Sequence, residues 1–242
     1  MTPREAHRKV RLASFPESTA MDILRLRDDL SYCLVDGHPI FLDIREDRYF
    51  RLSGELERLF LSHIDSTAHA PQELAPLIER DILTKMPRRN DLQGDIVPIA
   101  TCSALEAAPA RETFHPGIAA EVFATVCWTQ IQLKARPLKA ALDHLIDRRC
   151  RRVTQANDQS RAHVLGATAA FLNARKFVPI ETCCLLDSLS IADYLARRHL
   201  HANIVFGVTG DPFSAHCWAQ FEDVVLSDTT GHIRAYSVIR VI

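Results

Sequence analysis

The sequence lacks the features that define several simple classes of protein. Its 242 residues include seven cysteines but no CxxC pair, which excludes a zinc ribbon, and their odd number argues against a disulfide framework. We therefore expect reduced thiols in a cytoplasmic protein. Only eight glycines are present, and none belongs to a GxxxxGK loop, so the chain has no P-loop for nucleotide phosphates.

Long apolar runs and an excess of one charge are also missing. No stretch approaches the roughly 18 uninterrupted apolar residues that cross a bilayer, and the charged N-terminal residues are unlike a secretory signal. The 29 Lys and Arg nearly balance the 30 Asp and Glu, so no strongly basic face is available to neutralise nucleic-acid phosphates. The sequence predicts a protein that neither spans a membrane nor binds nucleic acid.

The composition is that of an ordinary folded protein, with 47% apolar and 24% charged residues. Residues 31–52 hold three apolar or aromatic runs separated by turn signals, which predicts an antiparallel meander followed by two amphipathic helices. We also expect a helical stretch over residues 117–150, which Pro137 interrupts, and a further helix over residues 161–176. We expect an α+β protein with a domain over residues 1–88 that begins with an unstructured arm at 1–20, a proline-containing linker at 89–115, and a second domain at 116–242.

The last quarter of the chain predicts a helix followed by a sheet, and it contains a cysteine, a histidine and a carboxylate. Cys184 lies in the first turn of the expected helix, with Thr182 as the expected N-cap, and a helix N-terminus lowers the pKa of a thiol. His216 and Asp228 lie on two adjacent expected strands. A thiolate, a base and an orienting carboxylate are what a cysteine peptidase or acyltransferase needs.

The residues alone leave alternatives open at this site. Cys183 competes with Cys184 as the nucleophile, and Asp223 competes with Asp228 as the orienting group. An odd-length loop around residue 222 would set His216 beside Asp228, whereas a two-residue loop would put them on opposite faces of the hairpin. A buried structural cysteine and an unrelated hairpin are the simpler alternative.

Three segments of the last 60 residues resemble one family. They are C-L-L-D-S at 184–188, F-G-V at 206–208 and P-F-S-A-H-C-W at 212–218, followed by a strand that ends in Asp228. Together they resemble the transglutaminase-like leader peptidases of lasso-peptide biosynthesis, the B proteins, whose pattern is C-L-x-x-S, G-V, P-F-x-A-H-A-W and a later Asp. The resemblance selects Cys184 over Cys183 and implies a papain/transglutaminase-like domain without a metal. Cys217 and Gln220 depart from the pattern.

The N-terminal segment D-G-H-P-I-F-L-D-I-R-E-D-R-Y-F-R-L is similar to the winged-helix leader-recognition domains of ribosomally made peptide pathways. In that family the leader pairs as an added strand at the edge of a three-stranded sheet. The resemblance implies a winged helix-turn-helix-like domain with a docking edge at Arg48, Tyr49, Phe50, Arg51 and Leu52.

The two resemblances together imply a cysteine peptidase that binds the leader of a lasso-peptide precursor and removes it. The expected partners are the precursor leader and an asparagine-synthetase-like cyclase that uses ATP to join the freed amine to an acidic side chain. We expect no cofactor on this chain, and any ATP dependence to come through the cyclase. The same triad would also serve a transglutaminase or N-acyltransferase, and a non-catalytic leader-binding adaptor is a further alternative.

Overall fold

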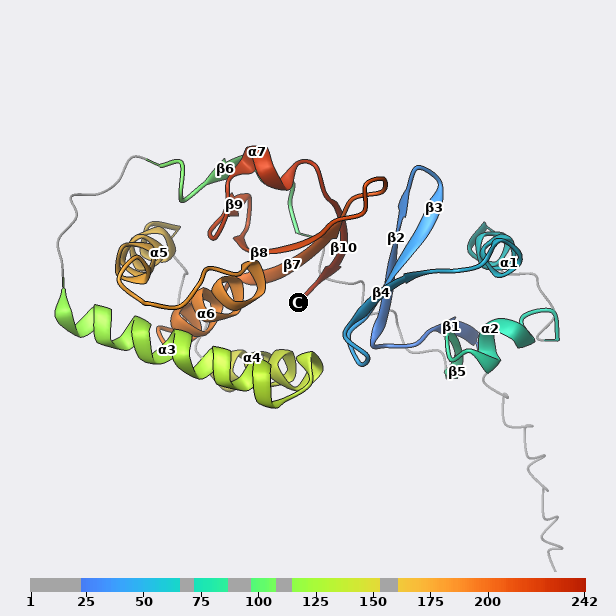
Figure 1. Cartoon of the computed structure of the whole chain (residues 1–242), viewed down its shortest axis with the longest axis horizontal. Helices are drawn as coiled ribbons and strands as arrows, with labels where there is room; N and C mark the ends of the chain where they lie inside the picture. The colour runs from blue at the N-terminus through green and yellow to red at the C-terminus, as the bar shows by residue number, and fades with distance from the viewer. Residues whose placement is uncertain (1–22, 66–71, 87–96, 108–114, 153–160) are drawn as a thin grey trace, which may run out of the picture.

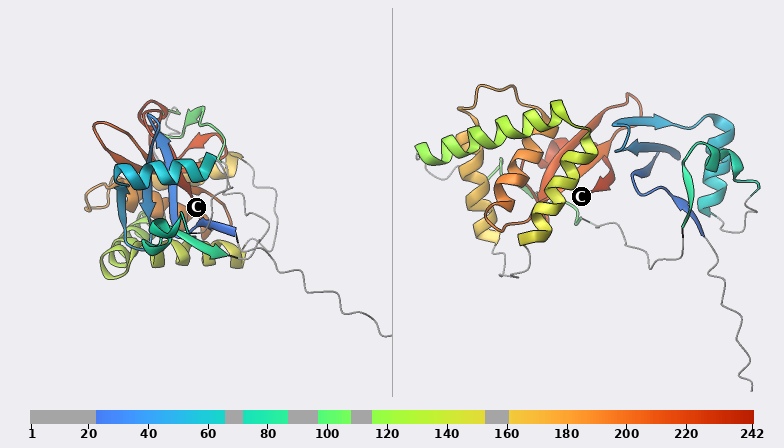
Figure 2. Two further views of the ribbon diagram at one scale, coloured as in Figure 1. Left: turned by 90° about the vertical axis from the view of Figure 1, so that its right-hand side faces the viewer. Right: turned by 90° about the horizontal axis from the view of Figure 1, so that it is seen from below.

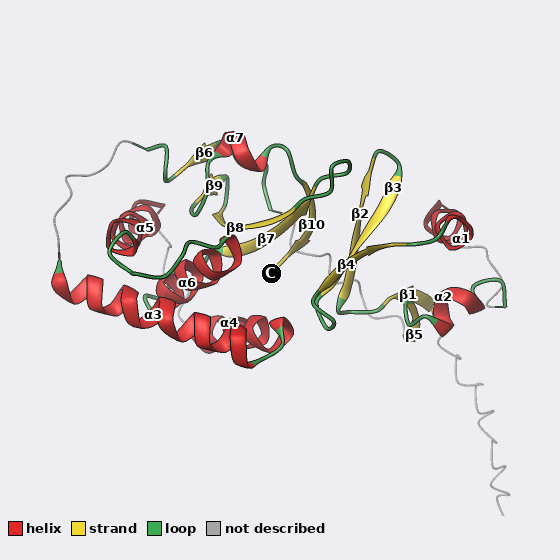
Figure 3. Ribbon diagram, viewed as in Figure 1, coloured by secondary structure: helices red, strands yellow, loops and turns green. Residues whose placement is uncertain are grey.

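The computed structural model describes residues 23–65, 72–86, 97–107, 115–152 and 161–242. The expected unstructured arm at residues 1–20 lies outside these ranges. A C-terminal lobe of helices packed on a five-stranded sheet lies beside an N-terminal lobe built around a three-stranded sheet (Figure 1). Figure 3 shows the strands of both lobes meeting in the middle of the molecule, with helices on the two outer sides. None of the described helices is both long and apolar enough to cross a membrane.

The N-terminal sheet is the expected meander. Its strands are β2 (Leu30–Val35), β3 (His38–Asp43) and β4 (Arg48–Arg51), in the order β2-β3-β4. Asp36 and Gly37 form the first turn, and both have positive φ angles of 53° and 82°, as an Asp-Gly hairpin turn requires. Because β4 pairs only with β3 among the described strands, it is an edge strand.

The part of this lobe that follows the sheet differs from the expectation. The first expected helix is α1 (Gly54–Asp65), but the second shrinks to one turn, α2 (Ala75–Glu79). Leu83 already belongs to β5 (Leu83–Met86), which pairs with β1 (Ile23–Leu26) in a two-stranded ribbon. The buried residues Leu74 and Leu77 belong to the N-cap and the single turn of α2, and the buried Ile82 directly precedes β5. They therefore do not lie on one continuous helix. A winged helix is not specifically shown.

The C-terminal lobe places its helices as the sequence predicts. Pro137 separates α3 (Pro116–Ala135) from α4 (Leu138–Arg152), because proline cannot continue the hydrogen-bond ladder of a helix. The next two helices are α5 (Arg161–Arg175) and α6 (Cys184–Ala196). In Figure 2 these helices cover one face of the C-terminal sheet, and α6 lies against both α3 and β8.

The C-terminal sheet has the strand order β10-β7-β8-β9-β6. Its members are β6 (Cys102–Ser103), β7 (Asn203–Val208), β8 (Ala215–Phe221), β9 (Val224–Val225) and β10 (Ser237–Val241), with the short helix α7 (Thr230–Ile233) between β9 and β10. β6 pairs in parallel with β9. The expected linker at 89–115 is thus partly a strand of this sheet, because Cys102 and Ser103 pair with Val224 and Val225.

The two lobes share one hydrophobic core through alternate residues of β3. Ile40 and Leu42 of β3, with Ile44 directly after the strand, are buried in the same cluster as residues of the C-terminal lobe, whereas Phe41 packs with α1 in the N-terminal core. This alternation is the period of two that a strand buried on both faces displays. The N-terminal sheet is therefore fixed against the C-terminal lobe rather than tethered to it.

Candidate active site

Cys184 is the first residue of α6, where the helix begins beside the sheet. The N-cap is Cys183, with φ −139° and ψ 132°, and not the expected Thr182; the Cys183 side chain itself makes no capping hydrogen bond. Asp187 takes over that task, because its Oδ2 accepts the Cys183 N–H at 3.2 Å while its Oδ1 accepts Arg175 Nε at 2.6 Å. The buried Arg175 guanidinium thus fixes the turn that presents Cys184.

The surroundings of Cys184 favour the thiolate. Hydrogen bonds from the Cys217 thiol, the His216 ring and the Cys217 backbone outweigh the opposing effect of burial, and they lower the pKa of Cys184 to about 4. The hydrogen bond to Cys184, together with burial, raises the pKa of the Cys217 thiol, so Cys217 stays protonated as a donor. The cysteine that departs from the family pattern therefore contacts the candidate nucleophile.

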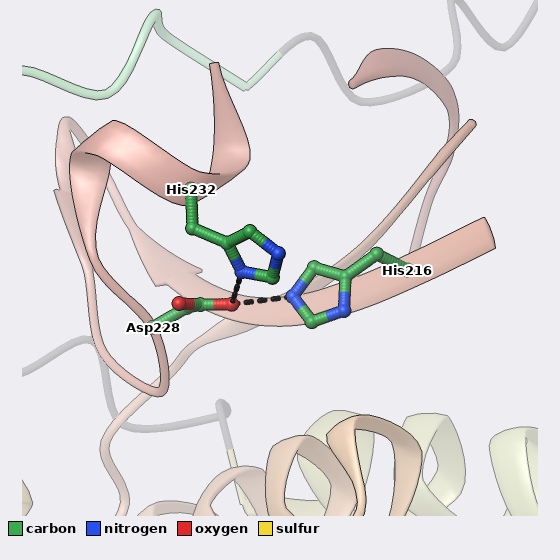
Figure 4. A group of neighbouring side chains, drawn as sticks. All are labelled: His216, Asp228 and His232. Carbon is green, nitrogen blue, oxygen red and sulfur yellow. Dashed lines mark hydrogen bonds and ion pairs between the residues drawn. The ribbon is translucent and has the colours of Figure 1, made fainter. Parts of the chain in front are cut away.

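His216 and Asp228 form the second contact of the site. His216 Nε2 lies 2.5 Å from Asp228 Oδ2 (Figure 4), which leaves Nδ1 of the same ring for the Cys184 sulfur. Burial disfavours the imidazolium, but hydrogen bonds to Cys184 and Asp228 raise the pKa of His216. Burial likewise opposes charge on Asp228, yet the Thr229 N–H and two histidines lower the pKa of this carboxyl. The three candidate residues are thus connected in the order sulfur, imidazole, carboxylate.

The loop that joins β8 to β9 is a two-residue turn, Glu222-Asp223, which was expected to separate His216 from Asp228. They meet nevertheless, because the ladder stops after Val225. Leu226 N still donates to Ala219 O at 2.8 Å, but Ala219 N donates to Ser227 Oγ at 2.9 Å. In a regular ladder the Leu226 carbonyl would be this acceptor. The serine hydroxyl replaces it, and the chain turns so that Asp228 reaches His216.

Three serines hold this departure from the ladder in place, and the sequence reasoning did not identify two of them. Ser188, fully buried on α6, lies 3.1 Å from Ser227 through their hydroxyl oxygens and donates to Cys217 O at 3.4 Å. Ser103 of β6 donates its hydroxyl to Asp228 O at 2.5 Å. Ser188 is the serine of the C-L-x-x-S motif, and its structural task is to tie the helix to the segment that carries Asp228.

Aromatic rings pack around the His216 ring. The centroid of Tyr236 lies 5.2 Å and that of Trp218 6.1 Å from that of His216. Gly207 makes this packing possible, because a Cβ at this position would lie 2.9 Å from both the Trp218 ring and the Tyr236 Cβ. Gln220 accepts the Trp218 Nε1–H at 2.9 Å while its amide donates to two backbone carbonyls. An ionised carboxylate at this position could not donate to these carbonyls.

The structure separates the competing candidates. Asp223 is occupied away from His216, since Arg161 Nη1 lies 2.5 Å from its Oδ1 and the Thr101 hydroxyl donates to it. Cys183 is exposed at the N-cap of α6, with its backbone N–H on Asp187. Of the two cysteines, Cys184 is the one whose pKa His216 helps to lower. Of the two aspartates, Asp228 is the one whose carboxylate contacts the His216 ring.

The expected docking edge, Arg48 to Leu52, lies beside this site. The Tyr49 ring packs edge-on against Phe213 with centroids 5.8 Å apart, and Arg51 Nη2 donates to Gly210 O at 3.2 Å. Both partners belong to the loop that leads into β8 and His216. Burial is the main cause that raises the pKa of Tyr49, and the charge of the nearby Cys184 thiolate adds to it. Phe50 points the other way and stacks on Phe41 at 5.1 Å.

One group of side chains in the described part of the chain could hold a metal ion. His216, Asp228 and His232 each offer a ligand atom, and these atoms lie within 4.8 Å of one another. Two imidazole nitrogens and a carboxylate oxygen suit a zinc-like ion. A metal bound there would occupy the Nε2 and the carboxylate that connect His216 to Asp228, so it would compete with proton transfer through this pair.

Comparison with known proteins supports the interpretation of the C-terminal part. Residues 127–241 match the transglutaminase-like superfamily, whose members generally act through a Cys-His-Asp triad. The matched residues include Cys184, His216 and Asp228. It is compatible with a cysteine peptidase or a transglutaminase-type activity. No curated protein and no solved structure matches the chain significantly.

Proposed function

We propose that this protein is a cysteine peptidase that removes the leader from a ribosomally made lasso-peptide precursor, with Cys184, His216 and Asp228 as its catalytic triad. The observation that carries this proposal is the chain of neighbouring groups that runs from the Cys184 thiol, whose pKa is lowered to about 4, through His216 to Asp228 Oδ2, which lies 2.5 Å from His216 Nε2. Such a chain supplies a thiolate at neutral pH and an imidazolium that is ready to donate a proton.

The reaction follows from this charge distribution. The Cys184 thiolate attacks the carbonyl carbon of the last leader residue, and His216 passes its proton to the leaving nitrogen as the peptide bond breaks. The core peptide departs with a free amine, and the leader remains as a thioester. Water then attacks the thioester while His216 accepts its proton, and the C–S bond breaks to release the leader acid. Asp228 fixes the tautomer of His216 in both steps.

The position of β4 supports the proposed leader docking. An added strand would pair with the free edge at Arg48 to Leu52, where Tyr49 and Arg51 already contact the β7–β8 loop. Main-chain pairing supplies affinity without demanding one leader sequence. A leader held on this edge is close to the Cys184 sulfur, which raises the effective concentration of the scissile bond. A cyclase that uses ATP is the proposed partner that consumes the freed amine.

Substitution of Cys184 tests the proposed chemistry. We expect Cys184→Ala to abolish leader removal from the precursor, as followed by mass spectrometry, while leader affinity stays within about twofold because the docking edge is untouched. The matched control is Cys183→Ala, which removes the neighbouring exposed thiol and should leave cleavage intact. Normal cleavage by Cys184→Ala would refute the nucleophile. A product that carries an added amine in place of water would favour an acyltransferase.

Backbone modification of the leader tests docking by strand pairing. In the Cys184→Ala background, leaders with single N-methylated amides should lose affinity at every second position only, because alternate amides of an edge strand point toward its partner. The double variant Tyr49→Ala, Arg51→Ala should weaken binding, whereas Leu34→Ser on the opposite edge strand, β2, should not. An affinity loss without a period of two would contradict strand addition at β4.

A further inference from the structure

His232 is a second histidine on the carboxylate of the candidate triad. It lies in α7, four residues after Asp228, and its Nδ1 is 2.8 Å from the same Asp228 Oδ2 that His216 contacts at 2.5 Å (Figure 4). The centroids of the two imidazole rings are 4.7 Å apart. One carboxylate oxygen therefore serves two histidines.

The hydrogen bonds around Asp228 fix which nitrogens carry protons. An ionised carboxylate only accepts, so His216 Nε2 and His232 Nδ1 must both be donors where they face Oδ2. The other oxygen, Oδ1, accepts the Thr229 N–H at 2.6 Å. Three donors thus hold both oxygens and outweigh the burial that would otherwise protonate this carboxyl. Without His232, the His216 ring would be the only donor to Oδ2 among the residues that the structure describes.

The local fold has a specific arrangement that places His232 there. Thr229 caps α7, and its hydroxyl accepts the His232 N–H at 3.3 Å. Thr230 donates its hydroxyl to Glu106 at 2.9 Å, which ties the helix to the segment after β6. The Tyr236 ring packs edge-on against His232, with centroids 5.5 Å apart. The His232 side chain is nevertheless 51% exposed, so hydrophobic burial does not explain a histidine at this position.

We propose that His232 is a positioning residue that holds the Asp228 carboxylate in the plane and direction that His216 requires. This inference rests on the proposed peptidase function, since it assigns a task within that triad. His232 does not touch the reacting atoms. It acts through Asp228, so that the carboxylate neither rotates nor exchanges its contact with His216 for water during proton transfer.

Two substitutions of His232 with side chains of similar shape separate the effect of the N–H donor from that of the side-chain volume. His232→Asn keeps an N–H group at the place of Nδ1, whereas His232→Leu has nearly the same outline without a donor. Losing a hydrogen bond to a charged group should lower kcat for leader removal in the Leu variant by about tenfold. KM should change by less than about twofold, because His232 is not part of the leader-docking edge, and the Asn variant should retain kcat within about threefold of the unsubstituted protein.

A second readout does not depend on any substrate. The proton on His216 Nε2 should give a downfield resonance in the proton NMR spectrum, which disappears in Asp228→Ala and so is assigned. We expect this resonance to persist in His232→Asn and to broaden by exchange with water in His232→Leu. If the unsubstituted protein cleaves no precursor, the peptidase proposal fails, but the resonance still tests the role of His232.

His38 provides a matched control, because it is a histidine on a carboxylate far from the site in sequence: its Nδ1 lies 2.6 Å from Glu57 Oε1. We expect His38→Leu to leave kcat and the resonance unchanged. The proposal is overturned if His232→Leu retains both, or if His232→Asn falls as far as His232→Leu. It also fails if His38→Leu lowers kcat equally, since the effect would then not come from Asp228.

Discussion

Two hairpins of this protein have the same two-residue connection and opposite outcomes. The β2–β3 hairpin turns at Asp36-Gly37 and keeps a regular register along its length, from Val35 opposite His38 to Leu30 opposite Asp43. The β8–β9 hairpin turns at Glu222-Asp223, and only two residue pairs follow before the ladder ends. A regular ladder in the second hairpin would have placed Asp228 opposite Cys217, on the wrong side for His216.

The difference shows that the second hairpin loses regular backbone pairing and thereby brings Asp228 to His216. The regular hairpin produces a strand buried on both faces, which packs one face in the core of the C-terminal lobe and the other in the N-terminal core. The irregular one delivers a carboxylate to a histidine, and the lost backbone pairing is replaced by the hydroxyls of Ser227, Ser188 and Ser103. Substitutions in the second hairpin should therefore affect catalysis first, and those in the first hairpin should affect stability alone.

Removal of the Asp228 carboxylate should have the largest effect. Asp228→Ala leaves His216 without its orienting acceptor, so kcat should fall on the order of 10³-fold. The contact with Asp228 also helps to raise the pKa of His216. The imidazolium should therefore lose its proton at lower pH in the variant, and the high-pH limit of activity should move down. Initial rates of leader removal across pH measure both effects, and an unmoved high-pH limit would contradict the assigned pair.

Removal of the Ser227 hydroxyl should destabilise the irregular hairpin and the segment that carries Asp228. Ser227→Ala leaves the Ala219 N–H without an acceptor, which should cost about 1–3 kcal/mol of unfolding free energy. The Asp228 segment would also lose its anchor, so kcat should fall about tenfold in the folded fraction. Ser227→Thr keeps the hydroxyl and should recover most of both. Denaturant unfolding and initial rates provide the test, and equal behaviour of the two variants would rule out the hydroxyl as the cause.

Substitution of Cys217 on β8 should have a smaller effect, a change in the pKa of Cys184. Its thiol is the first cause of the low pKa of Cys184, about 4. Cys217→Ala removes that donor, so the pKa of Cys184 should rise and the low-pH limit of its alkylation by iodoacetamide should move up. The experiment is done in a Cys183→Ser background and followed by intact mass, so that the exposed neighbour does not react. An unmoved limit would leave His216 and the helix terminus as the stabilising groups.

Much of the C-terminal lobe could be predicted from sequence because its signals are local. Pro137 ends α3, the spacing of apolar residues locates the helices, and the motif around His216 forms a strand. The pairing of His216 with Asp228 was a hypothesis from the residues and from the resemblance, but the hairpin rule allowed it only for an odd-length loop and predicted that a two-residue turn would separate them. The rule failed because Ser227 replaces a backbone acceptor, which is a tertiary event that strand periodicity does not contain.

The missed features depend on contacts between distant segments. Ser103 lay in an expected linker and reaches Asp228 only because β6 joins β9. The second of the two expected amphipathic helices became a turn and a strand, since pairing with β1 outweighed helical periodicity at Leu83. His232 did have a local signal, because Thr229 is a typical N-cap residue and the helical turn that follows it brings His232 back to Asp228. That signal gains meaning only when Asp228 is known to face His216.

The smallest effect belongs to the regular hairpin. Gly37 has φ 82°, and a Cβ added there would meet nothing within 4 Å. Gly37→Ala should therefore cost only the backbone strain of a left-handed residue, about 1 kcal/mol of unfolding free energy. Activity per folded molecule should not change, because no catalytic group depends on this register. Denaturant unfolding with initial rates checks both, and a loss of kcat at native conditions would show that the first hairpin positions the site as well.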